Sequence, residues 1–235
     1  YPASDAASVS TLLQGVWTEY DALGRARSVS QDSEHGLLTT LTEYLPGFRT
    51  QVTNPRGQQT TTGYMAYDQP GYDWPIAIVH PAGAYTDITR DPFGKPTAIV
   101  RRNGDGSQRI ERRYTYNAHQ ELCKALEPEI GATLMAYDGA GNLAWSATGH
   151  HDLPDPQQCN SAEGYWWGRR VDRTYDSRNR LSTLVFPDGL GNQQWSYTPD
   201  GLPASITTDN GASGVTVTNT YSYNKRRLLT GEGIA

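Results

Sequence analysis

The sequence predicts an all-β fold built from tandem antiparallel β-hairpins. Three observations lead to this prediction. A Tyr-Asp or Tyr-Asn pair recurs along the chain, Gly, Pro, Asn and Asp cluster at regular intervals as turn signals, and no long segment has helical periodicity. The chain has 235 residues, which is enough for one large all-β domain or two small ones.

The repeat is visible from its spacing. Copies start at positions 20, 44, 67, 90, 116, 137, 175, 197 and 223, and seven of the eight intervals span 21 to 26 residues. A single hairpin of this size cannot bury its apolar face alone, so neighbouring repeats must stack. The residues that carry the repeat signature are Tyr20, Asp21, Gly24, Tyr67, Asp68, Tyr137, Asp138, Gly141, Tyr175 and Asp176.

Each repeat contains the same elements in the same order. An Asp such as Asp21 opens a turn, because its side chain accepts hydrogen bonds from backbone groups two residues on. Gly24, three residues later, supplies the positive φ that reverses the chain. A segment of strand formers follows, as at 181–186, then a second turn, as at 187–189, and a second strand, as at 193–197. Each repeat is therefore predicted to be strand, turn, strand, turn.

The Tyr-Asp-x-x-Gly-Arg-Leu pattern, from Tyr20 to about Leu229, resembles the YD repeat of bacterial Rhs and wall-associated proteins. It is also similar to the repeats of the Tc-toxin cocoon subunits and of the teneurin ectodomains. The resemblance implies a curved, spiralling sheet that forms a partial shell or barrel. It also implies a secreted or cell-surface bacterial protein. The partners it implies are the remainder of a longer polypeptide, with an enclosed toxin domain, or another copy of the chain.

The expected organisation is an N-terminal lead-in strand at 1–19 and a YD-repeat domain at 20–235. The one long interval, 38 residues between Tyr137 and Tyr175, marks a loop insertion at about 150–170 that contains two prolines. Such a loop is either a tolerated surface insertion or a place where a function has been added to the scaffold.

Cys123 and Cys159 are the only cysteines. A disulfide between them would tie the insertion to the sheet, and it would imply an oxidising compartment. Two free buried thiols are the alternative. The bridge is the favoured interpretation, because neighbouring repeats can bring the two cysteines together.

Composition and motifs exclude several functional classes. The net charge of −5 gives no basic footprint for nucleic acid. A mean hydropathy of −0.65 and the lack of any apolar run near about 20 residues argue against membrane insertion. No Gly-x-Ser-x-Gly motif occurs, and most Asp residues are explained as turn positions. We therefore expect no catalytic residue and no cofactor.

A metal site is not expected either. His150 and His151, beside Asp152 and Asp155, form the best metal candidate in the chain. Adjacent histidines in a strand point to opposite faces, however, and zinc ligands are ordinarily two or more residues apart.

The leading functional hypothesis is a structural scaffold or encapsulating shell segment of a toxin-delivery or wall-associated polypeptide. A second hypothesis is a carbohydrate-binding or adhesion module that uses exposed aromatic rings. The candidate ligand contacts are Trp145, Trp166, Trp167, His150 and His151. The third is an enzyme built on the repeat scaffold.

Overall fold

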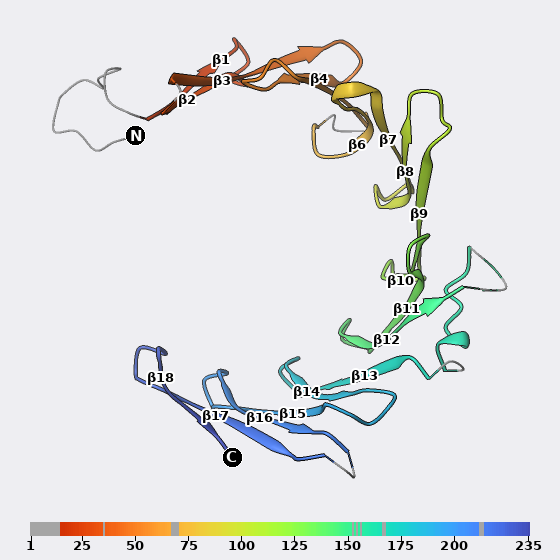
Figure 1. Ribbon diagram of the computed structural model, residues 1–235, viewed down its shortest axis with the longest axis vertical. Coiled ribbons are helices and arrows are strands. Elements are labelled where there is room, and N and C mark those ends of the chain that lie inside the picture. Colours follow the sequence, from red (N-terminus) through yellow and green to blue (C-terminus); the bar gives the residue numbers. More distant parts are fainter. Residues whose placement is uncertain are drawn as a thin grey trace. The chain divides into compact units, whose positions relative to one another are not determined.

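The computed structural model describes residues 15–34, 36–66, 71–151, 153, 155, 157–165, 168–211 and 214–235. Within these ranges the chain forms 18 β-strands and two single-turn 3-10 helices, and every strand pairing is antiparallel (Figure 1). The all-β class predicted from the sequence is confirmed. No helix in the described part of the chain is long and apolar enough to cross a membrane.

The chain divides into two compact units, residues 1–111 and 112–235. Strands of the first unit pair in chain order, each with the next. They are β1 (Val16–Tyr20), β2 (Ala26–Ser33), β3 (Gly36–Leu45), β4 (Arg49–Thr53), β5 (Gln59–Tyr64), β6 (Pro75–Val79), β7 (Ala84–Arg90) and β8 (Pro96–Asn103). The helix η1 (Pro81–Gly83) joins β6 to β7.

Strand β9 (Arg109–Tyr116) contains the boundary between the units, and its last four residues pair with β10. The second unit continues in chain order. Its strands are β10 (Leu122–Glu127), β11 (Gly131–Tyr137), β12 (Leu143–His150), β13 (Arg170–Tyr175), β14 (Leu181–Val185), β15 (Asn192–Tyr197), β16 (Pro203–Asp209), β17 (Val217–Tyr223) and β18 (Leu229–Ile234). The helix η2 (Glu163–Tyr165) lies between β12 and β13, within the predicted insertion.

One pairing rule explains how the repeat sequence produces these hairpins. The tyrosine of each described Tyr-Asp or Tyr-Asn pair faces the residue six positions later, and Tyr175 opposite Leu181 is an example. A register shift lies just before the tyrosine, so the five residues in between close a tight turn. The position of positive φ in that turn is held by Asn179 (φ 58°) and, in the preceding repeat, by Gly141 (φ 82°). The predicted roles of Asp and Gly in the turns are confirmed.

Buried hydrocarbon is scarce and is confined to one place. Among the described residues, the buried hydrophobic side chains all belong to the second unit: Cys123, Ala132, Leu134, Trp145 and Ala147. The buried side chains described in the first unit are polar: Ser28, Thr50 and Thr86. A sheet buries apolar side chains only where a second layer covers it, and in this chain the insertion supplies that layer.

Two expectations are not decided by this fold. Most of the lead-in segment 1–19 lies outside the described residues, and β1 pairs with β2 as the repeat strands pair with one another. The curvature and closure of the shell that the resemblance implies stay predictions.

Candidate functional site

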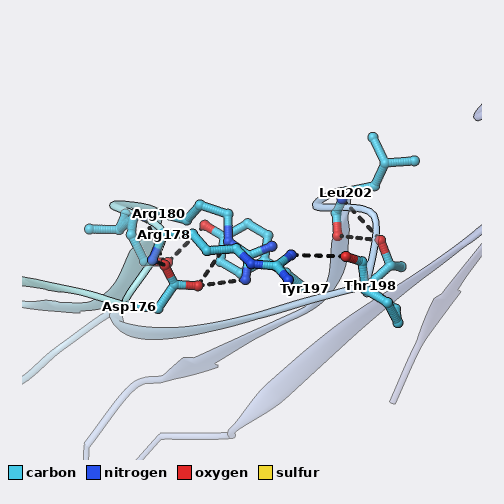
Figure 2. Close-up of polar contacts among 8 residues, drawn as sticks. Asp176, Arg178, Arg180, Tyr197, Thr198 and Leu202 are labelled. Atoms are coloured by element: carbon cyan, nitrogen blue, oxygen red, sulfur yellow. Dashed lines mark hydrogen bonds and ion pairs between the residues drawn. The ribbon is translucent and has the colours of Figure 1, made fainter.

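The contact between successive repeats is best seen at the turn after β13. Asp176 Oδ1 accepts hydrogen bonds from the backbone N–H of Arg178 (2.8 Å) and of Arg180 (3.0 Å). Its other oxygen, Oδ2, accepts from Arg180 Nε at 2.8 Å and Nη2 at 2.6 Å. One carboxylate therefore fixes the backbone of the turn and the direction of an arginine side chain together (Figure 2).

The arginine then meets the tyrosine of the next repeat. The Arg180 guanidinium lies 4.2 Å from the centre of the Tyr197 ring, within the range of a cation–π interaction. The Tyr197 hydroxyl donates a 2.7 Å hydrogen bond to the Leu181 carbonyl. A third link runs from Arg178 Nη1 to the Pro199 carbonyl at 2.9 Å. The ring and the hydroxyl of one tyrosine thus bind it to two parts of the preceding turn (Figure 2).

Charge strengthens this contact. Hydrogen bonds and the positive charge of Arg180 lower the pKa of the Asp176 carboxyl to about 2, so the carboxylate stays ionised at any ordinary pH. Asp21 has a lowered pKa for the same reason, because Arg25 pairs with it. In that turn the Arg25 guanidinium lies 3.9 Å from the centre of the Tyr44 ring.

The hydroxyl contact recurs along the chain at a fixed position. Each time, the acceptor is the carbonyl six residues after the tyrosine of the preceding repeat. The pairs are Tyr44 with Ala26 (3.1 Å), Tyr137 with Leu122 (3.0 Å), Tyr175 with Leu143 (3.1 Å) and Tyr197 with Leu181 (2.7 Å). The same chemistry therefore joins repeat to repeat in both units, and it uses the hydroxyl that a plain aromatic ring lacks.

The insertion between β12 and β13 forms the second notable feature. It covers the hydrophobic cluster of β11 and β12, where Leu134 is 0% and Trp145 is 6% exposed. Leu153 packs against this cluster. Gly164 is so close to the Trp145 indole that a Cβ there would lie 2.6 Å from the ring. The guanidinium of Arg170 lies 4.8 Å from the Trp145 ring centre.

Two consecutive residues of β10 attach the insertion to the sheet. Cys123 forms a disulfide with Cys159, with 5.2 Å between the Cα atoms. Lys124 is 1% exposed, and its Nζ donates to the Asp155 carbonyl at 2.8 Å and to Asn160 Oδ1 at 2.7 Å. The disulfide favoured from the sequence is present.

A bulge makes this double attachment possible. Neighbouring residues of a regular strand project to opposite faces. The pairing of β10 with β9 shifts register between Leu122 and Lys124, so Cys123 and Lys124 both reach the same loop. Burial lowers the pKa of the Lys124 ammonium, and the carboxylates of Asp155 and Glu163 oppose that effect.

Of the five candidate ligand contacts, the structure describes Trp145, His150 and His151. Trp145 was expected to be exposed, and the structure corrects this: its indole lies beneath the insertion. His150 is 3% exposed, and burial lowers the pKa of its imidazole. His151 is exposed. Five residues named in the sequence analysis lie outside the described part of the chain: Tyr67, Asp68, Asp152, Trp166 and Trp167.

The described residues offer no metal site, and the first unit has an open cavity whose charge is compensated. Among the residues that the structure describes, no group of three His, Cys, Asp or Glu side chains is placed to hold a metal ion. An open cavity of about 490 Å³ lies in the first unit, beside Tyr85 and Arg102. The Arg102 guanidinium pairs with Asp87 at 2.8 Å and lies 4.6 Å from the Tyr85 ring centre, so its charge is already compensated.

Sequence reasoning did not single out Lys124. A lysine in a strand ordinarily reads as an exposed charge. Its position directly after Cys123, one of only two cysteines, is the sequence feature from which its place near the insertion could have been predicted.

Comparison with known proteins identifies the fold. No protein-family model matches the sequence, and no curated protein matches it. A crystal structure of TcdB2-TccC3-TEV matches with a TM-score of 0.66 and 14% identity, over 93% of this chain. The Tc holotoxin pore of Photorhabdus luminescens matches with a TM-score of 0.51 and 12% identity over 92% of this chain. A crystal structure of TcdB2-TccC3 without its hypervariable C-terminal region matches with a TM-score of 0.51 and 11% identity, over 94% of this chain.

These likenesses support an Rhs-like fold. This chain spans only 11%, 13% and 14% of the lengths of those three chains.

Proposed function

We propose that this chain is a scaffold segment in the shell of a longer, secreted or surface-exposed toxin-related polypeptide, and that it has no catalytic activity of its own. The observation that carries the proposal is the recurring bond from a repeat tyrosine to the carbonyl six residues after the preceding repeat's tyrosine. A contact that recurs at four joints between repeats serves the wall as a whole, whereas a binding or catalytic site is built once.

Further support comes from the fold and from the cross-link. Structures with this fold belong to toxin assemblies in which the matching part is a small fraction of the chain. The partner in this proposal is the remainder of the same polypeptide. The Cys123–Cys159 disulfide suits an oxidising compartment, as a secreted protein would encounter.

The proposed mechanism is mechanical. Backbone ladders hold the strands, and the tyrosine contacts set each hairpin against the next. With little buried hydrocarbon, the wall resists bending through hydrogen bonds and ring contacts distributed along its length.

Carbohydrate binding is the weaker candidate. The hypothesis relied on exposed indoles, and the one candidate indole in the described residues, Trp145, is covered by the insertion.

The proposal is tested by native proteolysis of the full polypeptide that carries this segment, with mass mapping of the protected fragments. We expect the segment and the chain that it encloses to be protected together. The double variant Tyr175→Phe/Tyr197→Phe should open cleavage sites in both, while the control Tyr20→Phe, at a ring that is 64% exposed, should not. A segment that is cut away while the rest of the polypeptide stays protected would contradict a shell role.

A further inference from the structure

Lys124 and Asn160 meet inside the protein in an unusual way. Lysine is among the residues least often fully buried, because removing its charge from water is costly. Lys124 is nevertheless 1% exposed, and its Nζ lies 2.7 Å from Asn160 Oδ1. Its cross-strand neighbour Leu134 is also fully buried.

The two residues are held in place from both sides. The disulfide joins Cys123 to Cys159, the residues directly before them in the chain. Asn160 has a positive φ of 52°, a conformation that Asn tolerates better than most residues. The Asn160 carbonyl also accepts a 3.2 Å hydrogen bond from the Glu163 N–H. The disulfide and the backbone contacts therefore hold the two side chains close together before any reaction.

The distance suits bond formation as well as a hydrogen bond. Since a carbonyl bond is about 1.2 Å long, Nζ lies within about 4 Å of Asn160 Cγ, near the separation of a near-attack arrangement. Groups held at such a separation react far faster than the same groups free in solution.

We propose that Lys124 and Asn160 form an intramolecular isopeptide bond that cross-links the insertion to β10. In this reaction the neutral Lys124 amine attacks Asn160 Cγ, the new Nζ–Cγ amide bond forms, and the Cγ–Nδ2 bond breaks. The amine loses one proton, the leaving Nδ2 group gains it, and one ammonia molecule departs. Atoms and charge balance without any oxidant, metal or cofactor.

The surroundings supply the two requirements of this chemistry. The first is a neutral amine, and burial lowers the pKa of Lys124 toward that state. The second is a group that carries the proton from the amine to the leaving nitrogen. The carboxylate of Glu163 acts on Lys124 electrostatically, which partly opposes the effect of burial, and Glu163 lies three residues after Asn160. We therefore assign the proton transfer to Glu163, and its substitution tests that role.

The bond would give the insertion two covalent links at consecutive positions of the chain. Reduction breaks the disulfide, but an amide bond survives it. The insertion would then stay on the sheet in a reducing compartment. This inference does not depend on the proposed shell function, because it concerns the described residues of one unit.

The test is the mass of the full chain, purified, fully reduced and denatured. We expect a species lighter than the sequence mass by one ammonia, about 17 Da. Proteolysis should then give a branched peptide that joins the segments containing Lys124 and Asn160 and is resistant to reductant. Fragmentation of that peptide separates this cross-link from a succinimide at Asn103-Gly104, which would have the same mass deficit.

The variants Lys124→Arg and Asn160→Ser each remove one reacting group, and both should restore the full sequence mass. Glu163→Gln should keep the fold and slow or abolish the mass loss. A wild-type chain at its full sequence mass, with the two segments released as separate peptides after reduction, would overturn the proposal and leave a hydrogen bond alone.

Discussion

The hydroxyl of Tyr197 donates a 2.7 Å hydrogen bond to the carbonyl of Leu181, which lies six residues after Tyr175. The same residue, Leu181, faces Tyr175 across the hairpin. One position therefore closes its own turn and receives the tyrosine of the next repeat. This relationship converts a sequence period into a chain of linked hairpins.

Tyr197→Phe removes the hydroxyl and leaves the ring on Arg180. We expect the free energy of unfolding to fall by about 1 kcal/mol, the usual value of one such hydrogen bond. Tyr20→Phe, at an exposed ring, should change it by much less. Urea denaturation of the two variants measures the difference. Equal effects would show that the hydroxyl contact contributes nothing.

Substitution of Gly141 tests whether the turn requires a residue with a positive φ. Its φ of 82° is unfavourable for a residue with a Cβ, and a Cβ there would meet nothing closer than 3.7 Å. Gly141→Ala should therefore cost about 1–2 kcal/mol through backbone strain alone. Gly139, in the same turn, has open space and no positive φ, so Gly139→Ala is the matched control. Thermal or urea unfolding of both variants would refute the strain argument if they lost the same stability.

The lowered pKa of Asp176 predicts a pH dependence. Because the folded-state pKa of about 2 lies below the ordinary value of 3.8, ionised Asp176 stabilises the fold above pH 4. That contribution is lost as the pH falls from about 4 toward 2. Asp176→Asn keeps the turn hydrogen bonds, as Asn117 does in its own repeat, but removes the charge. The stability difference between wild type and variant should shrink over this pH range, and a constant difference would contradict the assignment.

The sequence predicted the parts of the fold that depend on local chemistry. The roles of Asp176 and Gly141 follow from their residue types, since a carboxylate accepts hydrogen bonds from the backbone and glycine tolerates a positive φ. The insertion followed from one long interval between repeats. The disulfide of Cys123 was one of two open alternatives, and neighbouring repeats made it the favoured one.

The burial of individual strand residues was not predictable, because it depends on which face of the sheet another segment covers. Trp145 alternates with its neighbours like any strand residue, and nothing in the local pattern shows that the loop after the strand folds back to cover it. The burial of Lys124 depends on a bulge, because a register shift of one residue moves a side chain to the other face of the sheet. The wrong expectation for Trp145 and the missing one for Lys124 have one physical origin: alternation along a strand gives two faces, and tertiary contacts decide which of them is buried.

Gly164 tests whether the insertion rests on the sheet. A methyl group at this position would press on the Trp145 indole at 2.6 Å, so Gly164→Ala should lower stability by about 1–3 kcal/mol through overpacking. Ser161→Ala, at an exposed site of the same loop, should have little effect. Urea unfolding and the rate of proteolysis within the loop are the two measurements. A loop that accepts both changes equally would not be packed on Trp145.

The disulfide and the proposed isopeptide bond close nearly the same loop, so their effects must be coupled. A cross-link between residues 36 positions apart stabilises by about 4 kcal/mol in the chain-entropy description. If Lys124 and Asn160 are already joined, Cys123→Ala/Cys159→Ala should cost much less than this, because the loop remains closed. In a Lys124→Arg background the same pair of substitutions should cost nearly the full amount. Urea unfolding of the four proteins completes this double-mutant cycle. An equal cost in both backgrounds would show that the disulfide is the only covalent link between the insertion and β10.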